Sequence, residues 1–310
     1  MTPSGMPITG PAAVNLGVAA CGANADLFRT LFPGFSDVNS LRDVANSTYH
    51  SLQTSATRTV GALTISASYT YSHSIDDSSD RGDVLFVNAY DISANRANSI
   101  FDLRHNFSLS YVYGLPFFKG SGWKHSLLGG WQVSGITVAQ SGLPFTVTNG
   151  TTFADNAGVA NGVGTGSRPD QVGDPKSVSA AQKASASSVF GPLYYNPSAF
   201  ALPTGLTFGN VGRNTLNLPG RLNFDFGLFK QFQIREKMGF QFRWEMFNVF
   251  NHTQFDAVSG NSVIGSNGGT TSTMDTTDPG SADSLASSTF LHLTGAHQPR
   301  IMQFGLRFQF

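Results

Sequence analysis

The residues of this chain that could do chemistry lie mostly in stretches rich in glycine, serine and asparagine. The densest acidic cluster consists of Asp76, Asp77, Asp80 and Asp83. Oxygen-rich loops can hold Ca²⁺, but this spacing differs from that of an EF-hand and no later glutamate closes the cluster. A solvated acidic loop is therefore the alternative interpretation. His292 and His297 lie five positions apart, a spacing that does not place both on one face of a helix.

No group of residues indicates catalysis. The chain has no Gly-x-Ser-x-Gly elbow, the turn that exposes a nucleophilic serine in many hydrolases. The glycine-rich run 162–166 has neither the preceding strand nor the following helix of a phosphate-binding loop. We therefore predict that the protein is not an enzyme and binds no cofactor or resident metal.

A second set of charged residues lies in stretches where polar and apolar residues alternate. Its members are Asp102, Arg104, Arg221, Asp225, Arg243, Glu245 and Arg307. Alternation with a period of two is typical of β-strands with one apolar and one polar face, and all seven charges fall on polar faces. Because unpaired charge away from water is costly, we expect these side chains to meet water or one another.

The elements that position these charges are seven predicted strands. They are expected at residues 51–56, 62–73, 102–113, 127–140, 221–234, 238–250 and 302–310. In the fourth strand, a bulge at Ser134 and Gly135 would bring Trp131, Val133, Ile136 and Val138 to one face. The last strand alternates Met302, Phe304, Leu306, Phe308 and Phe310 with polar residues. The chain is therefore predicted to be all-β.

Composition separates a membrane barrel from a soluble sandwich. Charged residues make up 12% of the 310 positions, about half the fraction of roughly 25% usual in soluble domains. The predicted polar faces carry mainly Ser, Thr, Asn and Gln, and the apolar faces are rich in Phe, Trp and Tyr. These features are typical of an antiparallel transmembrane β-barrel. The formal net charge of zero argues against a nucleic-acid partner.

The lengths of the connections predict the orientation of the barrel. Long connections at 74–101, 141–220 and 251–300 alternate with short ones at 57–61, 114–125 and 235–237. Transmembrane barrels have long extracellular loops and short periplasmic turns. We therefore expect the C-terminus in the periplasm, residues 1–46 as an extracellular-loop segment and residues 47–310 as barrel. A processed lipoprotein with its lipid on Cys21 is the alternative for the N-terminal part.

The sequence resembles the C-terminal barrel of TonB-dependent transporters, and more narrowly the Oar-like group. The resemblance covers about residues 45–310 and rests on the blocks 69–77, 101–107, 130–136, 141–145, 245–252 and 307–310. It implies a 22-stranded barrel in the outer membrane of a Gram-negative bacterium, filled by a plug domain and energised through TonB. It also implies that Phe304, Phe308 and Phe310 belong to the signal that the outer-membrane assembly machinery reads.

Seven strands are fewer than the resemblance implies, so the sequence predicts a C-terminal fragment of such a barrel. An intact eight-stranded barrel is the alternative. The implied plug, which has no counterpart in this sequence, or a passing substrate could then contact the charges on the polar faces. Two other functions stay open, namely a structural or adhesive surface β-domain and a soluble β-sandwich that binds carbohydrate. The substrate is not predicted.

Overall fold

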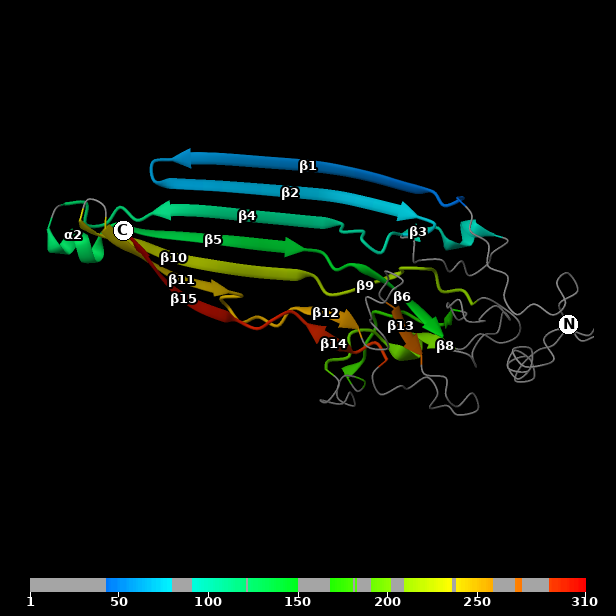
Figure 1. Ribbon diagram of the computed structural model, residues 1–310. Coiled ribbons are helices and arrows are strands. Elements are labelled where there is room, and N and C mark those ends of the chain that lie inside the picture. Colours follow the sequence, from blue (N-terminus) through cyan, green and yellow to red (C-terminus); the bar gives the residue numbers. More distant parts are fainter. Residues whose placement is uncertain are drawn as a thin grey trace, which may run out of the picture.

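Seven long strands form one antiparallel sheet, in which each strand lies beside its neighbours in the chain (Figure 1). The computed structural model describes residues 43–79, 91–120, 122–149, 168–180, 182, 191–201, 209–235, 238–258, 271–274 and 290–310. The long strands are β1 (Ser47–Val60), β2 (Leu63–Asp76), β4 (His105–Gly114), β5 (Trp131–Gln140), β10 (Arg221–Arg235), β11 (Met238–Phe247) and β15 (Ile301–Gln309). The short β3 (Ala97–Asn98) pairs with the end of β2.

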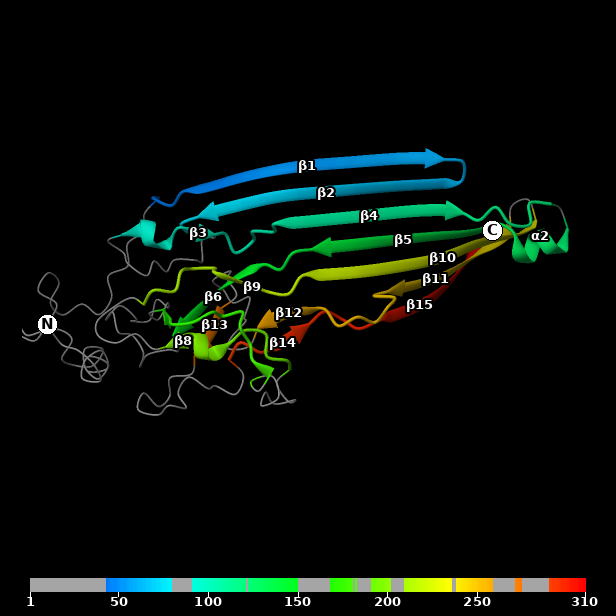
Figure 2. The same cartoon turned by 180° about the vertical axis from the view of Figure 1, so that it is seen from behind.

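The connections at the two ends of the sheet differ in length, as Figures 1 and 2 show from opposite sides. At one end lie the C-terminus, the tight turn at Gly61 and the helix α2 (Trp123–Leu128). Gly61 has a φ of 58°, a left-handed conformation that glycine adopts without strain. All three long connections leave from the opposite end. None of the helices in the described ranges is long and apolar enough to cross a membrane.

The register gives the sheet one apolar and one polar face. One apolar row runs across six strands, through Leu63, Tyr113, Val133, Leu228, Trp244 and Phe304. In this row, Leu63 is the first residue of β2, whereas β15 continues for five residues after Phe304, to Gln309. The ends of the strands are therefore staggered from one side of the sheet to the other. Such stagger is what tilted strands in a barrel require. Among the described residues, β1 and β15 each pair with one strand, so the sheet is not closed.

The predicted bulge in the fourth strand is wrong. The register of β5 is continuous against both β4 and β10, so Ile136 and Val138 lie on the polar face. Gly135 lies on the apolar face, where a Cβ atom would come within 2.5 Å of the Tyr111 ring. A glycine inside a strand marks either a bulge or a close approach, and here it makes room for a tyrosine on the next strand.

Three other sequence predictions need correction at the strand ends. β4 begins at His105, so Asp102 and Arg104 precede the strand. β11 ends at Phe247 because Asn248 turns the chain with a φ of 50°. β1 and β2 extend to Val60 and Asp76, beyond the predicted limits. Residues 1–42, including Cys21, lie outside the described residues.

The long connections contain their own secondary structure. The elements are η2 (Ile92–Asn95), β6 (Pro144–Asn149), β7 (Asp170–Gln171), η3 (Pro197–Ala199), β8 (Phe200–Ala201), β9 (Leu216–Asn217), β12 (Phe255–Val258), β13 (Thr271–Met274) and β14 (Leu293–Ala296). β6 pairs with β9 and β13, β12 with β14, and β7 with β8.

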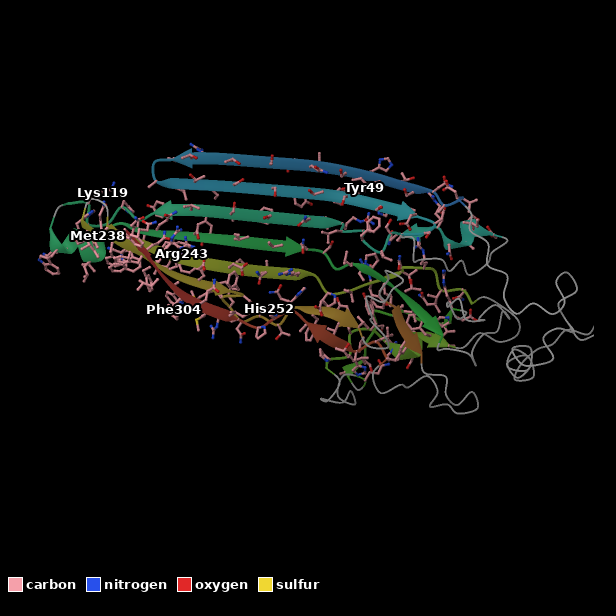
Figure 3. The ribbon with its side chains drawn as sticks, in the orientation of Figure 1. Tyr49, Lys119, Met238, Arg243, His252 and Phe304 are labelled. Atoms are coloured by element: carbon pink, nitrogen blue, oxygen red, sulfur yellow. The ribbon has the colours of Figure 1, made fainter. Side chains whose placement is uncertain are left out.

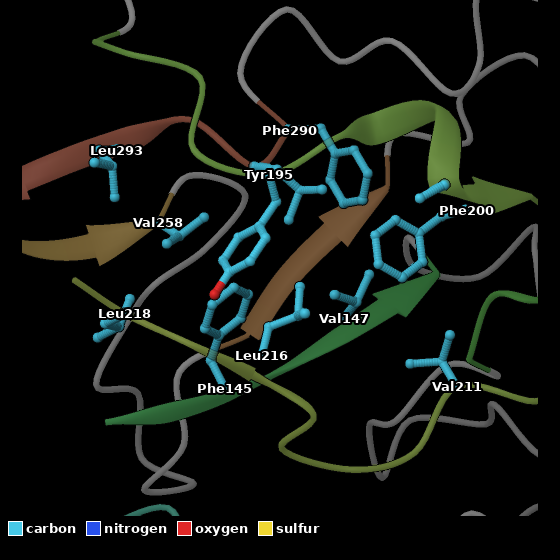
Figure 4. Packing of buried hydrophobic residues seen from close by; sticks show 12 residues of the cluster. Phe145, Val147, Tyr195, Phe200, Val211, Leu216, Leu218, Val258, Phe290 and Leu293 are labelled. Carbon is cyan, nitrogen blue, oxygen red and sulfur yellow. The ribbon is translucent and has the colours of Figure 1, made fainter. Parts of the chain in front are cut away.

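The hydrophobic core of the described residues lies in these connections (Figure 4). Phe145, Val147 and Phe200 from the 141–220 connection pack with Val258 and Phe290 from the 251–300 connection. The apolar face of the large sheet is exposed instead, and Phe304 and Leu306 of β15 are among its most exposed side chains. An apolar sheet face is left uncovered by protein when its solvent is lipid.

Candidate functional site

Five of the seven charged residues singled out from the sequence lie on the polar face of β10, β11 and β15. We call this surface the polar wall and define it by Arg221, Asp225, Gln231, Gln241, Arg243, Glu245, Gln303, Arg307 and Gln309. Its rows follow the register, with Gln303 opposite Glu245, Gly305 opposite Arg243 and Arg307 opposite Gln241. Figure 3 labels Arg243, which belongs to β11.

Hydrogen bonds between neutral amides and charged groups organise the polar wall. Gln303 Nε2 donates to Glu245 Oε2 at 2.7 Å, and Arg243 Nε donates to Gln241 Oε1 at 2.9 Å. The Arg243 guanidinium also lies 5.9 Å from the centre of the Phe229 ring, within the range of a cation–π contact. These contacts fix the positions of Arg243 and Glu245.

The charges of the polar wall do not pair with one another. Within the described ranges, no ion pair joins any two of Arg221, Asp225, Arg243, Glu245 and Arg307. Asp225 instead accepts hydrogen bonds from Asn223 Nδ2 at 2.8 Å and from the backbone N–H of Asn248 at 2.9 Å. Of the expected contacts, pairing with one another is therefore not seen for these five residues. Arg221, Arg243 and Arg307 therefore make no ion pair within the polar wall, and their charged groups are available to water or to a partner.

Asp102 and Arg104 have a local structural role at the start of β4. The buried Asp102 accepts the backbone N–H of Ser74 at 2.8 Å, and its other oxygen lies 3.2 Å from both His73 Nδ1 and Arg104 Nη2. These contacts fasten β4 to β2. Of the seven charged residues predicted to lie on polar faces, Asp102 and Arg104 are the two that pair with each other among the described residues.

The two described members of the acidic cluster are buried, so the solvated-loop interpretation is wrong for them. Asp76 pairs with Arg213, and Asp77 lies 3.6 Å from Arg96 and accepts the N–H of Asn46 at 3.1 Å. Asp80 and Asp83 lie outside the described residues, as does the glycine run 162–166. The described part of the chain contains no group of three or more residues suited to hold a metal.

The ion pair of Arg213 and Asp76 joins the 141–220 connection to the end of β2, and sequence reasoning missed it. Arg213 Nε donates to the backbone oxygen of Asn95 at 3.0 Å, and Arg168 Nη2 donates to Asn95 Oδ1 at 2.8 Å. Asn214 Nδ2 also donates to the backbone oxygen of Asn98 at 2.7 Å. We call these contacts the loop latch. No periodic pattern surrounds Arg213, so nothing in the sequence signalled its partner.

The asparagines of the block 245–252 shape the end of β11. Asn248 and Asn251 both have left-handed backbones, with φ of 50° and 52°. Asn248 Oδ1 accepts the N–H of His252 at 3.1 Å, and Asn251 Oδ1 accepts the N–H of Arg300 at 3.0 Å. Asparagine tolerates this conformation better than most residues. The block thus has a structural role, and His252, labelled in Figure 3, contributes through its backbone.

The three aromatic residues of the expected assembly signal lie on or just after β15. Phe304 stacks on Trp244 of β11 with 5.8 Å between ring centres, and Phe308 lies 6.3 Å from Phe310. Phe310 is 96% exposed.

The apolar face also carries a residue that the sequence analysis did not place, Lys230, which is 3% exposed and donates a hydrogen bond to the backbone oxygen of Gly129.

One family model matches residues 6–303, and its description is an outer membrane beta barrel domain. The match covers nearly the whole chain. No curated protein and no solved structure matches the chain.

Proposed function

The chain belongs to the outer membrane beta barrel domain family, and from that premise we propose that it is the barrel portion of a TonB-dependent transporter or receptor. The family implies an outer-membrane location, and we further propose that the cell is a Gram-negative bacterium. The finer assignment to the Oar-like transporters is supported by the six sequence blocks of the resemblance. We propose no enzymatic activity and leave the substrate open.

The observation that carries the proposal is the polar wall. Its three arginines face the side of the sheet opposite the lipid-facing aromatics, and they make no ion pair with the wall carboxylates. Arginine on a fixed strand is suited to bind carboxylates, phosphates or backbone carbonyls of a second polypeptide. A plug domain or an anionic solute would supply such groups to the three arginines.

The remaining partners are part of the same proposal. Outer-membrane lipid would cover the apolar face with its row of aromatic side chains. The assembly machinery would read the C-terminal strand that contains Phe304 and Phe308. The TonB system would act indirectly, through the plug. None of these partners requires a nucleic acid.

A site-specific crosslinking experiment tests the filled barrel. A photoreactive phenylalanine analogue replaces Arg243 or Arg307 in the protein produced in its own cells, and Leu306 on the apolar face is the matched control position. We expect polypeptide adducts from the two polar-wall positions and mainly lipid adducts from position 306. If neither polar-wall position gives a polypeptide adduct, and water-soluble thiol reagents reach both positions as cysteines, the interior is empty and the transporter proposal fails.

A structural or adhesive surface domain is the second candidate, and the core of the long connections favours it. Those connections pack around Phe145, Phe200 and Phe290, so they form a defined surface that could hold a partner outside the cell. The crosslinking experiment separates the two candidates, because a passive surface domain needs no polypeptide against its polar wall.

A further inference from the structure

The connection 115–130 exposes a group of large apolar side chains at the end of the sheet that carries the C-terminus. Trp123 of α2 is 71% exposed, and Phe117, which precedes the helix, is 58% exposed. Phe118, Leu127 and Leu128 are exposed as well. Several large apolar side chains exposed in one short segment indicate an interaction surface. A turn that only connects two strands is expected to expose polar side chains. This connection exposes large apolar side chains instead.

The described residues of this connection, 115–120 and 122–130, are held in a defined conformation. His125 Nδ1 donates to the backbone oxygen of Phe118, and the N–H of Gly129 donates to the backbone oxygen of His125 at 2.9 Å. Phe118 has a φ of 51°, which is a genuine outlier for a bulky residue. Such strain persists where the surroundings impose it, and it often accompanies function. Here it fixes the direction in which an exposed aromatic side chain leaves the backbone.

Lys230 ties the connection to the apolar side of the sheet. Its side chain lies on the apolar face between Trp131 and Phe242, and its ammonium donates to the backbone oxygen of Gly129. The same ammonium lies 5.3 Å from the Trp131 ring centre and 4.8 Å from that of Phe232. The end of the connection at Gly129 therefore lies on the apolar side of the sheet, rather than on the side of the polar wall.

The charges of the connection have one sign. Lys119 and Lys124 lie among the apolar residues, and no acidic residue occurs between Leu115 and Gly130. Lys124 Nζ lies 5.8 Å from the centre of the Trp123 ring, and Figure 3 places Lys119 at this end of the molecule. Tryptophan and leucine beside lysine on a short amphipathic element are typical of segments that lie in a membrane interface.

We propose that residues 115–130 form an interfacial anchor, which seats Phe117, Phe118 and Trp123 among the phospholipid headgroups of the periplasmic leaflet. Lys119 and Lys124 give this anchor a preference for anionic phospholipid. The proposal rests on the proposed membrane barrel and on its orientation, with short turns toward the periplasm. It goes beyond them because it assigns a lipid-binding role to a connection rather than to the strands.

Tryptophan quenching by brominated lipids tests the anchor. The full chain is reconstituted in vesicles that contain phosphatidylcholine or phosphatidylglycerol brominated on the acyl chains. The signal of Trp123 is the difference between the wild-type protein and Trp123→Phe, whereas the variant alone reports Trp131 and Trp244. We expect bromines near the headgroup to quench Trp123 more than bromines near the chain end. Brominated phosphatidylglycerol should quench it more than brominated phosphatidylcholine.

The lysines provide the specific part of the test. Replacing both Lys119 and Lys124 by glutamine should remove the preference of Trp123 for phosphatidylglycerol. Each lysine contributes a factor of up to about five to the affinity for the anionic lipid. The quenching of Trp131 and Trp244 should stay unchanged. If those two tryptophans are quenched and Trp123 is not, the anchor is wrong and the barrel stands. If none of the three is quenched, the membrane barrel itself fails.

Cysteine labelling in isolated outer membranes gives a second measurement that needs no reconstitution. Leu127→Cys on the apolar side of α2 is compared with Ser126→Cys on its polar side, both in a chain that carries Cys21→Ser. A membrane-impermeant maleimide, normalised to labelling in urea, should modify position 126 much faster than position 127. Equal rates at the two positions would overturn the anchor.

Discussion

Replacing Arg213 by methionine should open the loop latch while leaving the seven-stranded sheet intact. Arg213 is buried with Asp76, whose side chain is 1% exposed, and its guanidinium also donates to the backbone oxygen of Asp76 at 2.7 Å. Methionine fills a similar volume without charge. The substitution therefore leaves the Asp76 carboxylate without its cation, in a position where water cannot replace it.

The size of the effect follows from that burial. Removing one partner of a buried ion pair costs about 3 to 5 kcal/mol, which corresponds to an increase of about 10² to 4 × 10³ in the population of the open state. Replacing both partners, as Arg213→Met with Asp76→Asn, should cost clearly less because no buried charge remains. Arg96→Met is the matched control, since Arg96 is 45% exposed in its pair with Asp77 and such a pair contributes about 0 to 1 kcal/mol.

Hydrogen exchange of the protein in outer membranes measures this opening. Peptides that cover residues 91–100 and 209–217 should exchange faster in Arg213→Met by the factor given above, and those that cover β10 and β11 should not change. The reasoning is refuted if Arg96→Met and Arg213→Met accelerate exchange equally, or if the double variant is as open as the single one.

Three further predictions concern the C-terminus, the core of the long connections and the sheet. Deleting Phe310 should reduce heat-modifiable, assembled protein on gels far more than Phe308→Leu, because the assembly machinery is proposed to read the terminal residue. The loss of one buried Phe alone costs only about 1.5 to 3 kcal/mol. Tyr195→Phe should cost about 0.5 to 1.5 kcal/mol, measured by thermal unfolding of the connections, because its hydroxyl donates to the backbone oxygen of Asn217 in β9 at 2.7 Å. Burial raises the pKa of Tyr195 above its ordinary value of 10.0; its contribution to stability is complete below pH 10 and is lost as the pH rises through the raised value. Gly135→Leu should displace the Tyr111 ring and destabilise the sheet by about 1 to 3 kcal/mol in urea unfolding.

Each of these predictions has an outcome that would contradict it. Equal and mild assembly defects in the two C-terminal variants would mean that Phe310 acts only as a lipid-facing side chain. An unchanged loss of stability at alkaline pH in Tyr195→Phe would assign that loss to other groups, of which the neighbouring Tyr194 is one, since burial raises its pKa too. Thr137→Val is the control for Gly135, because Thr137 occupies the same face of β5. Equal destabilisation by both substitutions would refute the close approach of Tyr111.

The sequence predicted the strands well because their alternation reflects two different solvents. A strand between lipid and an aqueous interior must alternate apolar and polar side chains, and this pattern identified all seven long strands and their order. The same pattern placed Arg221, Asp225, Arg243, Glu245 and Arg307 on one face, where the register also places them.

The alternation failed where a strand departs from the rule for a local reason. Lys230 lies on the apolar face because its ammonium reaches a backbone oxygen at the end of the sheet, and the long flexible side chain allows this. Phe229 lies on the polar face, where its ring covers Gly227 and a Cβ on that glycine would meet it at 2.6 Å. A bulge and a covered glycine give the same sequence signal, so the phase of β5 could not be decided in advance.

The sequence by itself thus determined the fold class, the polar and apolar faces of the long strands other than β5, and the alternation of short and long connections, since these depend on residues that are neighbours in the chain. Only the tertiary structure revealed the core of the long connections and the loop latch. Arg213 and Asp76 are 137 positions apart, and Phe145 and Phe290 come from different connections. Contacts between such distant residues have no period, because their geometry depends on how the whole sheet brings the ends of its strands together.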